Sequence, residues 1–299
     1  MELVTHRILM DDELIYLSQA SEKEERRHIC STRDPTQSSA KKTFALVYAF
    51  AYIDKPNGEN MKVDVLAFGA HPDDVEITCA GTVAKLARSG KTVGIVDLTQ
   101  GELGTRGTKS IRNKEAEEAG KILGIAFREN LKIPDGNIEV NKRNVTRIIE
   151  TLRTYRPDVI LFPHSLERHP DHEHAFRLCK EAWFYAGLEK ISTRINGRKQ
   201  EPFRPKKYFH FMQKYEFTPS FIVDVSEVYE LKTKCLHAYE SQFHNPGSKE
   251  RETLLSSKLF LEHIRARDLH YGSLINVEFG EPFFSIEPIG LESLFDLKL

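Results

Sequence analysis

Apolar runs alternate with periodically apolar segments along most of the chain after Met61. The runs show little polar alternation, which indicates buried strands of a parallel sheet. Between them, apolar residues recur at the spacing of a helix face, as at Val145, Ile148 and Leu152. The predicted strands are 63–69, 92–99, 125–131 and 157–163, and the predicted helices are 77–90, 110–123, 141–155 and 171–187. We therefore predict an α/β fold: a three-layer, Rossmann-like, mostly parallel sheet with helices on both faces.

The pattern loosens after residue 200. Two further apolar runs predict strands, and two longer segments predict helices. These elements are strands at 207–212 and 220–226, and helices at 227–243 and 249–269. The C-terminal stretch 288–299 is apolar enough to pack against another surface, and we expect it to contribute to a contact with a partner subunit.

Residues 1–60 differ from the rest of the chain. Residues 21–42 are charged and polar without apolar periodicity, and a breaker sequence at 55–60 closes the segment. We predict an N-terminal extension, 1–60, that is poorly ordered, followed by one catalytic domain, 61–299. Met61 is then the ancestral start of the protein.

Composition narrows the classes of function only modestly. The formal net charge of the 299-residue chain is −1, so no global field draws it to nucleic acid or to an acidic membrane. No apolar run reaches the length of a membrane span. The four cysteines are scattered without a CxxC pair, which fits a reducing compartment better than a disulfide framework. We expect a cytoplasmic protein that binds neither nucleic acid nor membrane.

Two polar motifs follow directly after predicted strands. The first contains His71 and Asp74 after the strand 63–69, and the second contains His169 and His172 after the strand 157–163. In a doubly wound sheet the first and fourth strands are neighbours, and ligand sites form at their carboxyl ends. The two motifs are therefore expected to face each other across one crevice.

The residue types of these motifs suit a catalytic metal. Two imidazoles and one carboxylate, here His71, Asp74 and His172, leave a fourth position open, as in catalytic zinc sites. A bound zinc ion acidifies water and polarises a carbonyl. A carboxylate outside the ligand set, Asp73, is placed to accept a proton from that water.

The remaining polar residues of the second motif have supporting roles in this hypothesis. His169 is a spare histidine that can stabilise an oxyanion or protonate a leaving amine. Asp171 can fix the tautomer and orientation of one imidazole by hydrogen bonding.

Other interpretations remain open at this point. The first motif alone is equally compatible with a helix N-cap. His71, Asp73 and His172 also fit the two-histidine, one-carboxylate triad of non-haem iron oxygenases, although that triad usually sits on an antiparallel β scaffold. A non-enzymatic binding module is a third class. No GxGxxG follows the first strand, which excludes the usual dinucleotide site.

The motifs "AHPDD" at 70–74 and "HPDH" at 169–172, on this βα framework, resemble the LmbE-like or PIG-L-like family of zinc-dependent N-acetylglucosamine deacetylases. The resemblance runs from Met61 to near the C-terminus. It implies a metal-dependent N-deacetylase, a hydrolase acting on a linear amide C–N bond. The roles it implies are metal ligands His71, Asp74 and His172, general base Asp73, oxyanion-stabilising or acid residue His169, and Asp171 behind it. The resemblance implies zinc as the metal, and ferrous iron stays open because it accepts the same three ligands.

Within the family, the stretch 65–77, "YESQF" at 239–243 and "RHPDH" look most like the bacillithiol-biosynthesis branch. That branch removes acetate from N-acetylglucosaminyl-malate, whereas other relatives act on other N-acetyl sugars, including chitin fragments. The resemblance implies that three residues bind the substrate: Arg112, Asp135 and Gln242. It also implies a homo-oligomer, and the Gly-rich loop 101–108 is expected to act as a lid over the sugar.

Overall fold

The structure is a computed structural model that describes residues 6–10, 13–17 and 62–297. It divides into two units. In the first, β1 (His6–Met10) and β2 (Glu13–Leu17) form an antiparallel pair. The rest of the predicted extension, and with it the hypothesis about Met61, lies outside the described residues.

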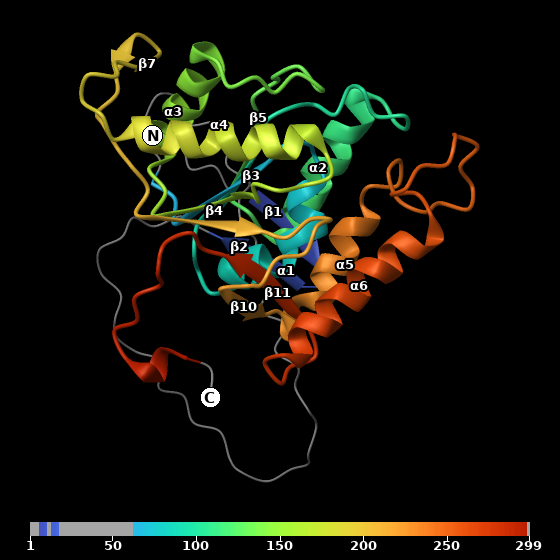
Figure 1. The fold of residues 1–299 in the computed structure, drawn as a ribbon. Coiled ribbons are helices and arrows are strands. Elements are labelled where there is room, and N and C mark those ends of the chain that lie inside the picture. The colour runs from blue at the N-terminus through green and yellow to red at the C-terminus, as the bar shows by residue number, and fades with distance from the viewer. Residues whose placement is uncertain (1–5, 11–12, 18–61, 298–299) are drawn as a thin grey trace. The chain divides into compact units, whose positions relative to one another are not determined.

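The second unit is built on a seven-stranded sheet (Figure 1). Its order is β10-β11-β9-β6-β3-β4-β5. The strands in that order are β10 (Phe221–Asp224), β11 (Gly280–Phe284), β9 (Lys207–Phe211), β6 (Val159–Pro163), β3 (Val65–Gly69), β4 (Val93–Asp97) and β5 (Phe127–Asn130). The five strands from β9 to β5 are parallel, and β11 is antiparallel to both of its neighbours. Val65 of β3 pairs with Val93 and with Val159, which confirms that the first and fourth predicted strands are adjacent.

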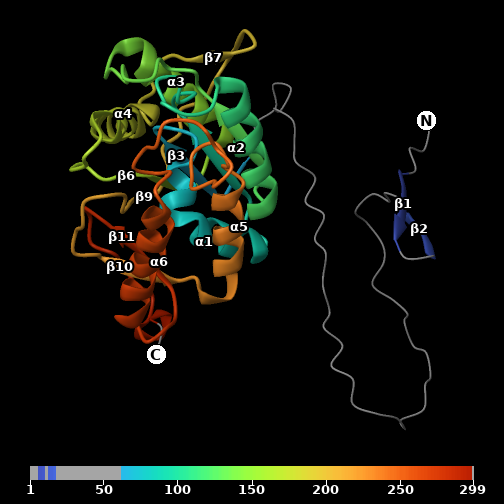
Figure 2. The ribbon, with the colours of Figure 1, turned by 90° about the vertical axis from the view of Figure 1, so that its right-hand side faces the viewer.

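Helices cover both faces of this sheet, as predicted. α3 (Lys142–Tyr155) and α4 (Pro170–Ala186) pack on one face, and the side chains of both belong to one hydrophobic core. α1 (Asp74–Arg88), α2 (Lys109–Leu123), α5 (Tyr229–His237) and α6 (Lys258–Ser273) supply the core on the other face. Figures 1 and 2 show α3 and α4 on the side of the sheet opposite to α1, α5 and α6. No helix in residues 62–297 is both long and apolar enough to cross a membrane.

The C-terminal third departs from its predicted boundaries. The helix predicted at 249–269 begins only at Lys258, because Thr253 and Ser256 exchange side-chain to backbone hydrogen bonds that compete with helix formation. The prediction missed β11, since Pro282 within a strand pattern argues against a strand. It also missed the short hairpin of β7 (Arg194–Ile195) and β8 (Arg198–Lys199).

One cluster of charged residues is fully buried against α1. The Lys232 ammonium nitrogen lies 2.7 Å from Asp268 Oδ2 and 2.7 Å from Glu281 Oε1. Glu281 also accepts hydrogen bonds from the backbone of Gly81 and Thr82, at 2.9 and 2.7 Å. None of the three charged side chains is exposed, so this cluster ties α5, α6 and β11 to α1.

Candidate metal centre and active site

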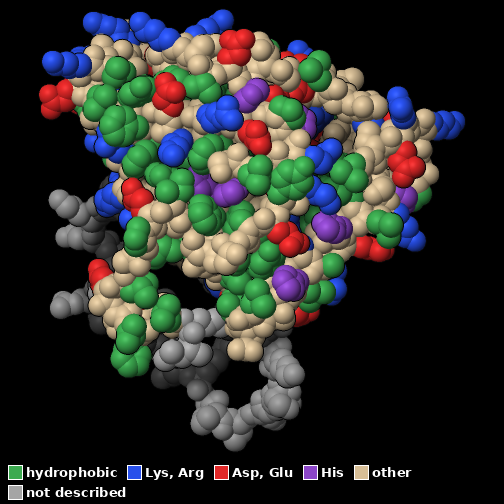
Figure 3. All heavy atoms as spheres, viewed as in Figure 1, with side chains coloured by type: hydrophobic (Ala, Val, Ile, Leu, Met, Phe, Trp, Pro, Cys, Tyr) green, Lys and Arg blue, Asp and Glu red, His purple; other side chains and the backbone are tan. Residues whose placement is uncertain are grey.

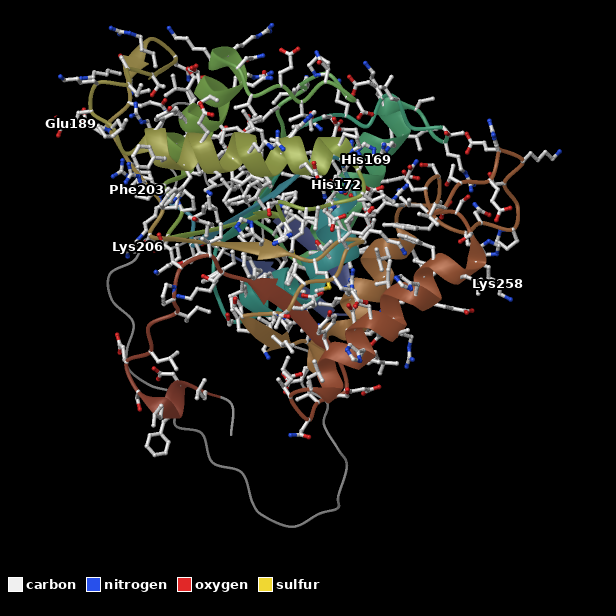
Figure 4. All side chains as sticks on the ribbon, in the orientation of Figure 1. His169, His172, Glu189, Phe203, Lys206 and Lys258 are labelled. Atoms are coloured by element: carbon white, nitrogen blue, oxygen red, sulfur yellow. The ribbon has the colours of Figure 1, made fainter. Side chains whose placement is uncertain are left out.

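The two predicted motifs meet at the carboxyl edge of the sheet, because β3 and β6 are adjacent and parallel. The ring centroids of His71 and His169 lie 4.9 Å apart, and those of His71 and His172 lie 5.5 Å apart. Figure 4 shows His169 and His172 together at the N-terminal end of α4. Residues separated by roughly a hundred positions in the sequence thus form one cluster.

The imidazole rings of His71 and His172 both face the Asp74 carboxylate. His172 Nε2 lies 3.2 Å from Asp74 Oδ1, and His71 Nδ1 lies 3.6 Å from Asp74 Oδ2. One potential ligand atom from each residue lies within 4.8 Å of the others. Although burial opposes it, the facing His172 and His71 hold the pKa of Asp74 well below its usual range.

This donor set fits a divalent metal. A carboxylate and two imidazoles can all offer lone pairs at one point. His172 Nδ1 is buried and has no hydrogen-bond partner within residues 62–297. The other ring nitrogen, Nε2, lies 3.2 Å from Asp74 Oδ1, so a cation held here would be shared by an imidazole and a carboxylate.

Two carboxylates orient His71 from the side away from Asp74. His71 Nε2 lies 3.0 Å from Asp135 Oδ1 and 3.4 Å from Asp171 Oδ2. Burial lowers the pKa of His71, but these two carboxylates and Asp74 outweigh that effect and raise the pKa to well above its usual value. A hydrogen held on Nε2 leaves Nδ1 as the free ligand atom toward Asp74.

The same contacts define where two predicted residues lie. Asp135 Oδ2 accepts a hydrogen bond from the backbone of Leu103 at 2.8 Å, so both of its oxygens have protein partners. Asp171 faces His71 and accepts a hydrogen bond from the backbone of Gly136 at 2.7 Å. Contact between Asp135 and a sugar hydroxyl stays a prediction.

Asp73 adopts a backbone conformation that a simple helix cap does not need. It is the N-cap residue of α1, with φ of 113°, and its side chain makes no capping hydrogen bond. A non-glycine residue with such a φ is strained, and strain of this kind clusters at functional sites. The helix-cap interpretation of the first motif therefore does not account for the Asp73 side chain.

The Asp73 carboxylate instead faces Arg112 of α2. Arg112 Nη2 lies 3.2 Å from Asp73 Oδ2. Burial raises the pKa of Asp73 to about 7, against the lowering effect of Arg112 and with a further increase from Asp74. Arg112 also donates to the carbonyl oxygens of Pro72 at 2.7 Å and Gly101 at 2.9 Å. The Arg112 guanidinium therefore binds both the Asp73 carboxylate and the backbone of the Gly-rich loop 101–108.

His169 is the N-cap residue of α4. Its Nδ1 accepts the backbone N–H of Asp171 at 3.2 Å, so in the neutral ring the hydrogen is on Nε2. Burial lowers the pKa of His169, and the neighbouring His71 and His172 lower it further. The ring is thereby prepared to donate one hydrogen bond from Nε2.

A cavity of about 320 Å³ lies over these residues. The predicted residues Arg112, Asp135 and Gln242 line it together with the histidine cluster. The Gln242 amide nitrogen donates to the carbonyl oxygen of Arg106 at 2.8 Å, so it holds the loop 101–108. In Figure 3, histidine and basic side chains lie among hydrophobic ones near the middle of the face shown.

The sequence prediction overlooked several residues of the cavity. Gln213 follows β9, whose carboxyl end lies at the same sheet edge as that of β6. Arg106 lies in the Gly-rich loop with only 5% of its surface exposed. The signal for Gln213 was available: a polar residue directly after a predicted strand. The sequence analysis did not predict which strands lie beside 207–212, so it could not place Gln213 next to the two motifs.

Comparison with known proteins gives consistent relationships. Residues 66–183 match a protein family described as PIG-L: GlcNAc-PI de-N-acetylase. The diacetylchitobiose deacetylase of Thermococcus kodakarensis is 29% identical over 241 residues, which cover 77% of this chain and 84% of that protein. The uncharacterized deacetylase YaiS of Escherichia coli is 32% identical over 150 residues, covering 45% and 77%. Among solved structures, the conserved protein TT1542 from Thermus thermophilus has a TM-score of 0.70 and 35% identity, covering 78% of this chain and 98% of that one.

Proposed function

Because this chain belongs to the PIG-L family of de-N-acetylases, we propose that it hydrolyses the acetamide of an N-acetylglucosaminide with zinc as its metal. The relationship to deacetylases supports an N-deacetylase, and the His/Asp cluster supports a metal site. The observation that carries the proposal is the placement of Asp73. It lies beside the ligand set in a strained conformation and leaves its helix uncapped.

Each residue of the cluster has a defined task in this reaction. His71, Asp74 and His172 would hold the zinc ion, which when bound polarises the amide carbonyl and acidifies a nearby water. Asp73 accepts the proton from the attacking water, and Arg112 keeps its carboxylate in place.

His169 completes the reaction on the substrate side. Its Nε2–H donates a hydrogen bond to the oxyanion that develops as water adds to the carbonyl. The C–N bond then breaks, acetate forms, and the departing amine takes up a proton from Asp73 or His169. The products are acetate and a free amino sugar.

For the rest of the substrate we propose N-acetylglucosaminyl-malate. Arg106 supports an acidic group on the aglycone: its side chain is buried, it lines the cavity, and its Nη2 has no hydrogen-bond partner within residues 62–297. The carboxylate that it pairs with, Glu250, is half exposed and 3.5 Å from Nε. A buried guanidinium with a free nitrogen suits a carboxylate ligand. Arg112, which the resemblance implies as a substrate-binding residue, already contacts Asp73, Pro72 and Gly101.

A neutral chitin fragment is the alternative, favoured by the relationship to the diacetylchitobiose deacetylase. An iron oxygenase has no such support, although ferrous iron accepts the same ligands. Cytoplasmic location and a homo-oligomeric state stay predictions.

Acetate release from N-acetylglucosaminyl-malate and from diacetylchitobiose separates these substrates. We expect the malate compound to have the higher kcat/KM, and Arg106→Gln to lower that value roughly tenfold or more through KM, because a charge-assisted hydrogen bond contributes about 1.5–3 kcal/mol. The neutral sugar should lose much less. Arg265→Gln, an exposed arginine on α6, is the control. Equal losses on both substrates, or a preference for chitobiose, would rule out the acidic aglycone.

A further inference from the structure

Gln213 reaches both loops of the metal centre from a third strand. It lies just beyond β9, and its amide Nε2 donates to Asp74 Oδ1 at 2.9 Å. The same nitrogen lies 3.4 Å from His172 Nε2. One amide group therefore contacts two of the three residues assigned to the metal, one from each motif.

The turn that carries Gln213 is fixed from two sides. Glu167 Oε1 accepts the backbone N–H groups of Lys214 and Tyr215, at 2.9 and 3.2 Å. Arg267 donates to the carbonyl oxygens of Met212 and Gln213, at 3.3 Å each.

Both anchoring side chains are themselves held. Glu167 is 4% exposed and accepts a further hydrogen bond from the backbone of Arg168 at 3.1 Å. Arg267 donates to the carbonyl oxygen of Ile77 in α1 at 2.7 Å and lies 3.1 Å from Asp268. The backbone at Gln213 is thus positioned relative to α1 and to the loop before α4, which carry the metal ligands.

The orientation of the Gln213 amide follows from its partner. The Asp74 carboxylate only accepts hydrogen bonds, so the nitrogen of the amide must face it. The amide oxygen, Oε1, is then buried and without a partner within residues 62–297. A buried unpaired carbonyl costs stability, which an apolar side chain of the same length would avoid.

We propose that Gln213 is a positioning residue for the metal ligands: its amide N–H holds the Asp74 carboxylate in the orientation that binds the metal. The inference rests on the proposed function, because it assumes that Asp74 and His172 bind a metal. Partners that orient ligating groups in this way commonly change metal affinity ten- to a hundredfold when removed.

The test is zinc affinity of the full-length protein, measured by competition with a chromogenic chelator. In Gln213→Met the side-chain length is kept and the donor is lost, so we expect the zinc dissociation constant to rise about tenfold or more. The melting temperature of the metal-free protein should stay the same or rise, since the unpaired carbonyl is gone. Gln213→Asn keeps the amide but is one methylene too short, and it should weaken zinc binding similarly.

Gln200→Met is the matched control. Gln200 is also a buried glutamine whose Nε2 is bonded, to Glu150 and Thr154. Its Oε1 has no partner in the part of the chain that the structure describes, and it lies outside the cavity. This variant should keep zinc affinity.

Two results would overturn the inference, and they differ. If the wild type binds zinc and both Gln213 variants bind it equally well, Gln213 does not position the ligands, while the proposed function stands. If the wild type binds no divalent metal, the proposed function fails together with the inference.

Discussion

Among the clusters of buried charged side chains in residues 62–297, two along α1 differ in how their charges are compensated: one at its start and one against its middle. In the cluster around Lys232, one ammonium group lies between Asp268 and Glu281, and backbone N–H groups complete the Glu281 carboxylate. Its charges are balanced by fixed protein groups. Buried charges are stable only when compensated in this way.

The cluster at the carboxyl edge of the sheet is compensated differently. Asp74 faces two imidazoles, and Asp73 holds a strained conformation without a side-chain cap. Burying the Asp74 carboxylate costs free energy in the protein alone, and a bound cation would offset that cost. We therefore infer that the first cluster stabilises the fold, and we propose that the second serves to bind a ligand and to carry out chemistry.

The largest expected effect follows from removing the proposed base in the second cluster. Asp73→Asn keeps the size of the side chain and tolerates positive φ, but it cannot accept a proton from water. We expect turnover to fall roughly 10²–10⁴-fold with zinc still bound, as measured by acetate release and metal analysis. If the variant kept more than about a tenth of the rate, the general-base role would be wrong.

The next largest effect is on stability, and it tests the cluster around Lys232. Lys232→Met leaves two carboxylates buried without their cation and should cost about 3–5 kcal/mol of unfolding free energy, measured in urea. Lys234→Met, on the same helix, removes an exposed pair with Glu230 and should change the unfolding free energy far less. Similar losses in both variants would show that the first cluster does not stabilise the fold as described.

The parallel half of the fold could be predicted from the sequence because each element there carries its own local signal. Strands β3, β4 and β6 are continuous apolar runs, and α3 shows a clear apolar face. Their order follows general rules of doubly wound sheets, which placed the two motifs together.

In the C-terminal third, β9, β10, α5 and α6 coincide with or overlap predicted elements, but β11 was not predicted. β11 contains Pro282 and the buried Glu281, whose partner Lys232 is far away in the sequence. Local patterns do not encode such pairs. For the same reason the sequence placed Asp73, Asp74 and the histidines in one site but did not identify Gln213 or Arg106, whose roles depend on which strands and loops lie side by side.

The most direct test of the central claim is the thermal unfolding of chelator-treated protein as zinc is added back, with acetate release followed on the same samples. If the second cluster awaits a cation, zinc at a hundred times its dissociation constant should stabilise the wild type by about 2.7 kcal/mol and restore acetate release. His172→Ala, which lacks one ligand, should show neither response. A wild type that unfolds at the same temperature with and without zinc, and releases acetate equally well in both states, would contradict the account.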